Sequence, residues 1–167
     1  MKVGLFYGST TGNTARVADL IRAVLGNRVT VCQHIKKTTP EEFLSCDGLI
    51  LGVSTWEEGL MQEHFRDFLP ELDQMNLRGK TVALFGLGNQ QGYSGRFLDA
   101  LGTLYAKVRQ RGATIVGEWP IAGYRFVASA AVVGDKFVGL ALDEDSQAHL
   151  TQQRIEAWVA SIQPFFE

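Results

Sequence analysis

Short apolar runs alternate along this chain with stretches in which apolar residues recur at helical spacing. The run at 2–7 ends at Gly8, as expected for a buried parallel strand. From Thr14 to Leu25 the apolar residues fall on one helical face, and Gly26 supplies a stop signal. The chain is therefore predicted to begin with a strand, a tight loop and a helix.

The same alternation continues to the end of the chain. Further strands are predicted at 28–33, 48–53 and 81–86, and a fifth begins at 113 and resumes at 137–142. Further helices are predicted at about 40–44, 62–69, 94–111 and 151–165. The stretch at about 118–138 has no helical period, so we interpret it as an insertion in or beside strand five.

Five strands that alternate with helices predict an α/β fold with a doubly wound, five-stranded parallel sheet. The order 2-1-3-4-5 is one of two common solutions for such a sheet. In that order the loops at 8–14, 54–61 and 87–93 meet in one crevice at the carboxyl ends of the strands, where open parallel sheets bind ligands. The length of 167 residues favours a single domain over 1–167.

Composition narrows the classes of partner. A formal net charge of -2 gives no overall electrostatic reason to bind nucleic acid or an anionic membrane. No apolar stretch is long enough for a membrane span, so we expect the chain in the cytoplasm. We also expect a monomer. Cys32 and Cys46 lie in or beside predicted strands, which is more typical of small buried side chains than of a disulfide or a metal site.

The loop after the first strand is rich in hydroxyl groups, from Ser9, Thr10, Thr11 and Thr14. They surround Gly12 at the predicted start of a helix, where free backbone N–H groups and the helix dipole favour an anion. A triphosphate loop needs Gly-x-x-x-x-Gly-Lys-Ser/Thr, but the second glycine comes one residue early and Asn13 stands where lysine would. The dinucleotide pattern Gly-x-Gly-x-x-Gly is also absent. The loop therefore predicts a monophosphate site, with a simple helix cap as the alternative.

Two aromatic residues follow strands that should border the crevice. Trp56 comes just after the third strand, and Tyr93 just after the glycine-rich loop at 86–92. Two aromatic walls can hold a flat, largely apolar ring while loop amides meet its polar rim. Either residue alone could simply pack over its own loop, but their joint placement with the phosphate loop favours stacking.

Four segments together resemble the flavodoxins, in their long-chain class: Leu5-Phe-Tyr-Gly-Ser-Thr-Thr-Gly-Asn-Thr14, Ser54-Thr-Trp56, Ala83-Leu-Phe-Gly-Leu-Gly-Asn-Gln-Gln-Gly-Tyr93 and Phe137-Val-Gly-Leu-Ala-Leu-Asp-Glu-Asp-Ser-Gln147. The resemblance covers about residues 2–165. It implies non-covalent FMN with its ring between Trp56 and Tyr93 and with Asp145 near the ribityl chain. The cofactor-binding residues that it implies are Ser9, Thr10, Thr11, Gly12, Asn13, Thr14, Ser54, Thr55, Trp56, Glu57, Glu58, Gly59, Leu87, Gly88, Asn89, Tyr93 and Asp145.

The resemblance also implies a function, that of a low-potential one-electron carrier that cycles between flavin semiquinone and hydroquinone and is not an enzyme. Its partners would be an NADPH-dependent flavodoxin or ferredoxin reductase and a downstream oxidoreductase. In flavodoxins a carbonyl after the loop-three aromatic turns toward the ring; here it would be that of Glu57, a residue that should resist positive φ.

One alternative is a flavin-dependent NAD(P)H quinone reductase, which needs an open ring face. Another is a receiver domain, which needs acids where Gly8 and Ser9 stand.

The chain departs from the flavodoxin pattern in its charges. Asn89 stands where flavodoxins usually have Asp, and Ala122 also replaces a common acid, which should ease reduction of the flavin. Residues 57–73 are mainly acidic and residues 78–111 mainly basic. The acidic run is either a solvated helix face or a docking patch for a basic partner. His34, His64 and His149 lie on different predicted elements and are expected to be structural or solvated.

Overall fold

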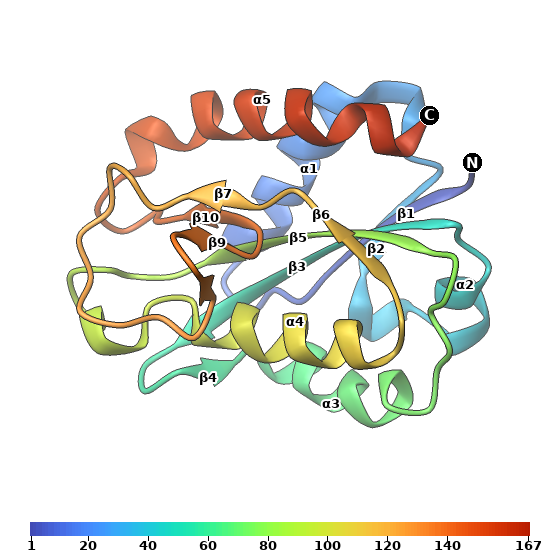
Figure 1. Ribbon diagram of the computed structural model, residues 1–167, viewed down its shortest axis with the longest axis horizontal. Helices are drawn as coiled ribbons and strands as arrows, with labels where there is room; N and C mark the ends of the chain where they lie inside the picture. Colours follow the sequence, from blue (N-terminus) through green and yellow to red (C-terminus); the bar gives the residue numbers. More distant parts are fainter.

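A parallel sheet forms the middle layer of the protein, which is described by a computed structural model of residues 1–167 (Figure 1). Its order is β2-β1-β3-β5 followed by β10, with β6 also paired to β5. The strands are β1 (Val3–Tyr7), β2 (Val31–His34), β3 (Gly48–Trp56), β5 (Thr81–Leu87), β6 (Thr114–Val116) and β10 (Leu140–Leu142). The doubly wound parallel sheet predicted from the sequence is therefore confirmed.

Strand five consists of two short segments at the same edge of the sheet. β6 pairs with residues 81–83 of β5 and β10 with residues 85–87, both in parallel. The insertion between them forms a small antiparallel sheet of order β7-β9-β8. Its strands are β7 (Trp119–Pro120), β8 (Val132–Val133) and β9 (Lys136–Phe137).

The expected continuous strand at 137–142 is wrong in one respect, because the run divides between the two sheets. Phe137 ends β9, and Leu140 begins β10. At Gly139 the chain passes so close to β5 that a Cβ there would overlap the backbone carbonyl of Leu84. Both halves of the run are buried, so their apolar pattern gives no sign of the division.

Helices cover both faces of the sheet, with α1 and α5 on one side and α3 and α4 on the other (Figure 1). Val3 and Leu5 of β1 pack in the core under α1 and α5, whereas Phe6 enters the opposite core. All three side chains are fully buried, and each contributes about 1.5–3 kcal/mol by leaving water. The helices are α1 (Asn13–Leu25), α2 (Pro40–Leu44), α3 (Glu63–Leu72), α4 (Asp99–Gln110) and α5 (Thr151–Ile162). None of them has both the length and the hydropathy to span a bilayer.

The helix expected from residue 94 begins as an α-helix only at Asp99. Residues 94–96 form a 3₁₀ turn, and the buried Leu98 takes a left-handed backbone conformation with φ of 59°. Such a conformation costs a non-glycine residue about 1–2 kcal/mol. A cap from the sheet offsets this cost, because Thr55 Oγ1 at the end of β3 accepts a hydrogen bond from Ala100 N at 3.0 Å. The cap ties the start of α4 to the crevice.

Candidate cofactor site

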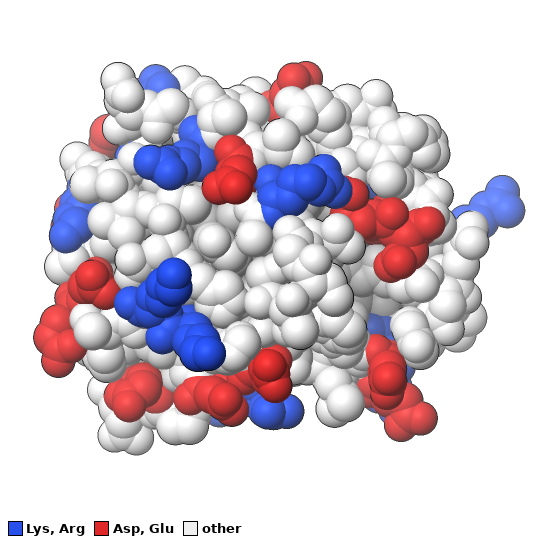
Figure 2. All heavy atoms as spheres, turned by 180° about the vertical axis from the view of Figure 1, so that it is seen from behind, with Lys and Arg blue, Asp and Glu red and all other residues white.

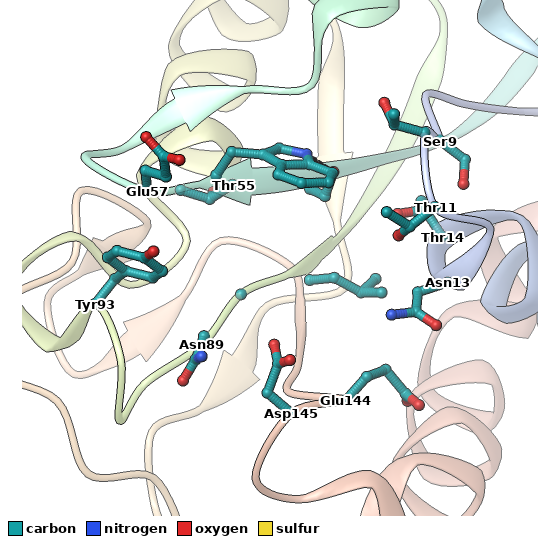
Figure 3. A pocket seen from close by; sticks show the side chains of 15 residues that line it. Ser9, Thr11, Asn13, Thr14, Thr55, Glu57, Asn89, Tyr93, Glu144 and Asp145 are labelled. Atoms are coloured by element: carbon teal, nitrogen blue, oxygen red, sulfur yellow. Dashed lines mark hydrogen bonds between the residues drawn. The ribbon is translucent and has the colours of Figure 1, made fainter.

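The carboxyl ends of β1, β3, β5 and β10 border a cavity of about 540 Å³. Figure 3 shows Ser9, Thr11, Asn13 and Thr14 at one end of it and Tyr93 and Glu57 at the other. Its lining residues are Ser9, Thr10, Thr11, Asn13, Thr14, Ser54, Thr55, Trp56, Glu57, Leu87, Gly88, Asn89, Tyr93, Glu144 and Asp145. The three predicted crevice loops therefore meet at one cavity, joined by the loop after β10.

Three of the predicted cofactor residues do not line this cavity. Gly12 forms the turn into α1, and Glu58 and Gly59 lie at the tip of the hairpin between β3 and β4 (Leu60–Met61). Conversely, Glu144 lines the cavity and was not predicted. Its only signal in the sequence is its place in the acidic run 143–145, which does not distinguish a cavity wall from an exposed loop.

The phosphate-loop end presents donors that have no partner within the chain. Gly12 has φ of 96°, a conformation that favours glycine, and its N–H donates to Ser9 Oγ at 3.1 Å. No side chain caps α1, and the backbone N–H groups of Thr10, Thr11, Asn13 and Thr14 make no hydrogen bond within the protein. Unpaired amides beside hydroxyl groups at a helix N-terminus fit the oxygens of a phosphate.

No cationic side chain lines the cavity. Arg16, in the first turns of α1, forms an ion pair with Glu144, whose side chain is only 9% exposed. The hydroxyl of Thr151 also donates to Glu144. The phosphate-loop end therefore attracts an anion through neutral donors and the helix dipole.

A buried glutamine supports the phosphate loop from behind. Gln62 is 1% exposed, and its Nε2 donates to Thr10 Oγ1 at 3.1 Å and lies 2.9 Å from His64 Nδ1. Its Oε1 accepts from Phe65 N at 3.0 Å and so caps α3. A side chain at Gly8 would overlap Gln62 Oε1, which explains why a glycine precedes the loop.

Two histidines that are far apart in the sequence meet at this support. The ring centroids of His34 and His64 are 5.1 Å apart, and His34 Nε2 lies 2.9 Å from Ser9 O. His34 Nδ1 accepts from Lys36 N at 3.1 Å. Both nitrogens of His34 and Nδ1 of His64 therefore contact groups of the protein, as expected for histidines with a structural role.

The opposite end of the cavity carries the two aromatic rings. Trp56 is 37% exposed, and its Nε1 donates to Ser54 Oγ at 2.9 Å, which fixes the indole orientation. Tyr93 is 44% exposed. Exposed aromatic faces that line a cavity suit a flat apolar ligand.

The turn after Trp56 differs from the expectation that Glu57 would resist positive φ. Glu57 has φ of 40°, and its carbonyl accepts from Gly59 N at 2.9 Å within the hairpin. A non-glycine residue in this region stores strain of about 1–2 kcal/mol. The turn is therefore strained at a residue that lines the cavity.

The acidic loop after β10 is organised by Asp143, which is fully buried. One carboxylate oxygen accepts from Gln90 N at 3.0 Å, Gln90 Nε2 at 2.9 Å and Ser146 Oγ at 2.6 Å. The other accepts from Asp145 N and Ser146 N at 3.1 and 2.9 Å. Burial alone would raise the pKa of Asp143, but the hydrogen bonds from Ser146 and Gln90 outweigh it and lower that pKa.

Asp145 titrates in the opposite direction. Partial burial, and then the neighbouring charges of Asp143 and Glu144, raise its pKa above the ordinary value. Figure 3 places Asp145 and Glu144 along one wall of the cavity with Asn89 nearby. Glu144 lies toward Asn13 and is paired with Arg16, so Asp145 is the carboxylate of this wall nearer the aromatic end.

Comparison with known proteins agrees with this geometry. The family model described as Flavodoxin matches residues 5–158. The chain belongs to the flavodoxin family. It is 48% identical to flavodoxin 1 of Escherichia coli K12 over 95% of this chain and 91% of that one. It is 44% identical to a Synechocystis flavodoxin over 99% of this chain and 98% of that one. Among solved structures, Fusobacterium nucleatum flavodoxin bound to flavin mononucleotide is 31% identical, with a TM-score of 0.94 over 99% of each chain.

The position at which flavodoxins were expected to carry an acid has a defined geometry here. Asn89 Oδ1 accepts from Gln91 N at 3.2 Å and from Gly92 N at 2.8 Å. The side chain thus closes a tight turn while it lines the cavity. An aspartate could make the same two hydrogen bonds, so the turn itself does not require an amide at this position.

Proposed function

We propose that this chain binds FMN non-covalently in the 540 Å³ cavity and carries single electrons between other redox proteins. One observation carries the proposal: unpaired amides and hydroxyls lie at one end of the cavity, and exposed aromatic rings lie at the other. Such a pair of ends matches a ligand with a phosphate at one end and a flat ring at the other. Its flavodoxin relatives, including one described as bound to flavin mononucleotide, support the same assignment.

The cavity residues suggest a role for each part of the cofactor. The loop Ser9–Thr14 would hold the phosphate, and Trp56 and Tyr93 would face the ring. Residues 54–59 and 87–89 would meet the rim of the ring, and Asp145 would lie near the ribityl chain. When bound, FMN supplies the one-electron chemistry, and the protein sets the environment of the ring.

The chain's own charges set the direction of this tuning. Asp143 lies beneath the cavity wall with a pKa below its ordinary value, so it is ionised at neutral pH. Glu144, Asp145 and Glu57 add carboxylates that line the cavity. These carboxylates would disfavour a negatively charged, reduced flavin ring, so the reduction potential of the bound flavin would fall.

A titration tests the proposed function directly. Apoprotein titrated with FMN should quench flavin fluorescence with one-to-one stoichiometry, and riboflavin should bind more weakly because it has no phosphate. The bound flavin should then accept two electrons in two separate steps in a redox titration. Failure of FMN, riboflavin and FAD to bind would overturn the assignment.

We further propose that the electron donor is an NADPH-dependent reductase in the cytoplasm. The free thiols of Cys32 and Cys46 fit a reducing compartment. Figure 2 shows acidic and basic side chains interspersed over one face, without a continuous field of either sign. If the reductase docks on such a mixed-charge surface, the rate of reduction should depend only moderately on ionic strength. A loss of several orders of magnitude between low and high salt would contradict docking on a surface of mixed charge.

A further inference from the structure

Gln90 is buried although it lies in a surface loop. It is 3% exposed, whereas its neighbour Gln91 is exposed. Its backbone N–H and Nε2 both donate to Asp143 Oδ2, at 3.0 and 2.9 Å. Its Oε1 accepts from Arg125 N at 2.6 Å. One side chain thus joins three segments: the loop after β5, the loop after β10 and the insertion.

The residues held by these contacts line the aromatic end of the cavity. Asn89, directly before Gln90, lines the cavity, and Tyr93 N donates to Asn89 O at 3.0 Å. The carboxylate that Gln90 contacts also accepts from Asp145 N. The position of Gln90 therefore fixes both the loop that carries Tyr93 and the wall that carries Asp145.

We propose that Gln90 is the positioning residue of the ring end, which holds Asn89, Tyr93 and Asp145 in the arrangement that binds and tunes the flavin. This inference rests on the proposed function. It also gives the insertion a structural link to the cofactor, because Arg125 belongs to the insertion and its N–H is bound by Gln90.

Loss of the side chain would remove two hydrogen bonds. The partly buried Arg125 N would lose its acceptor, and the buried Asp143 Oδ2 would keep two of its three donors. A polar group that loses its partner is hydrated only if the ring loop moves outward, so the ring loop of the apoprotein would be displaced. The ring loop would then have to be ordered when the flavin binds, and we expect a Kd about tenfold higher, equivalent to about 1.4 kcal/mol.

Gln90→Ala compared with Gln91→Ala tests the inference, because the second variant removes the same side chain from an exposed neighbour with no side-chain hydrogen bond. Gln90→Ala should raise the Kd for FMN and for riboflavin by the same factor, about tenfold, and should weaken the visible circular dichroism of bound flavin. Gln91→Ala should match the wild type. If the wild type binds FMN and both variants match it, Gln90 is not a positioning residue. If the wild type binds no flavin, the proposed function itself fails.

Gln90→Glu adds a pH profile that a purely structural defect would not produce. When protonated, the introduced carboxyl can donate to Asp143 and accept from Arg125 N as the amide does; when ionised, it faces the Asp143 carboxylate. The ratio of the variant's riboflavin Kd to that of the wild type should approach one near pH 5 and rise about tenfold near pH 8. Riboflavin is the probe because it has no phosphate that titrates in this range. A ratio that does not change with pH would overturn the inference.

Discussion

The two ends of the cavity are built alike but differ in charge. At the phosphate-loop end, Gln62 is 1% exposed and joins Thr10 to His64 and to the start of α3. At the ring end, Gln90 is 3% exposed and joins the ring loop to Asp143 and to the insertion. The direct partners of Gln62 are a hydroxyl, an imidazole and an amide, whereas Gln90 binds a buried carboxylate.

Because of this difference, we expect the phosphate-loop end to affect mainly the affinity for FMN and the ring end to affect mainly the reduction potential of the flavin. Neutral donors can bind a phosphate through hydrogen bonds and the helix dipole, without a cation that would also stabilise a negatively charged reduced ring. A fixed carboxylate beneath the ring end disfavours the reduced ring and gives little help to phosphate binding. Substitutions at the two ends should therefore have different signatures.

The largest expected effect is on stability, from Asp143→Asn. In either orientation, the amide NH2 of Asn would face N–H donors that the carboxylate now accepts from, either Gln90 N and Nε2 or the N–H groups of residues 145 and 146. We therefore expect the unfolding free energy of the apoprotein to fall by about 2–3 kcal/mol at pH 7. Because the folded protein lowers the pKa of Asp143, its contribution is present above the ordinary aspartate pKa and is lost as the pH falls through the lower folded value. Urea unfolding at pH 7 and pH 3 should show a smaller difference from the wild type at pH 3. An equal difference at both pH values would argue against an ionised Asp143.

Gln62→Ala, at the phosphate-loop end, should weaken the binding of FMN more than the binding of riboflavin. Removal of the side chain leaves Thr10 Oγ1 and Phe65 N without their partner and loosens the phosphate loop. We expect the Kd for FMN to rise about 30-fold, or about 2 kcal/mol, while the Kd for riboflavin changes by less than about threefold. Parallel titrations of both ligands measure this, with Gln91→Ala as the control. Equal losses for the two ligands would remove the distinction between the ends.

Asn89→Asp should add a carboxylate at the ring end and lower the reduction potential of the flavin. The two hydrogen bonds from Gln91 N and Gly92 N can be kept, so the substitution adds a charge with little change in the turn. The potential of the second one-electron step should become more negative by about 50 mV, equivalent to about 1 kcal/mol for one electron. Gln91→Glu adds the same charge on an exposed side chain and should have a smaller effect in the same spectroelectrochemical titration. An unchanged or raised potential would show that position 89 does not tune the flavin.

The sequence predicted the parts of the site that are local. Ser9 to Thr14 form one contiguous loop, and Trp56 and Tyr93 each follow a predicted strand, so periodicity and turn residues were enough to place them. Gln62, Gln90 and Asp143 were missed, because Gln62 acts on a residue 52 positions away and Gln90 on one 53 positions away. Nothing in the local pattern distinguishes a buried glutamine in a loop from an exposed one such as Gln91.

The fold shows the same limit. The starts of β1, β3 and β5 were predicted to within one residue, whereas β2 begins three residues later than predicted, after a 3₁₀ turn at 26–28. The split of strand five depends on the approach of Gly139 to Leu84. The start of α4 likewise depends on a cap from Thr55, which lies 45 residues earlier. The hydrophobic pattern of a sequence indicates which residues are buried, but it does not indicate which residues pack against them.

The smallest expected effect concerns Asp145, whose pKa the folded protein raises. A carboxyl group whose pKa is raised by folding stabilises the protein only while it is protonated, and that contribution is lost as the pH rises through the folded pKa. Asp145→Asn should therefore raise the unfolding free energy of the apoprotein at pH 7, because partial burial and then the charges of Asp143 and Glu144 disfavour the ionised carboxyl. The gain should be only about 0.5 kcal/mol, because solvent reaches the side chain and screens these charges. At pH 3 the variant and the wild type should be equally stable. Equal stability at pH 7 as well would mean that neither burial nor the charges of Asp143 and Glu144 disfavour an ionised Asp145, and that solvent already screens the negative charge of this loop.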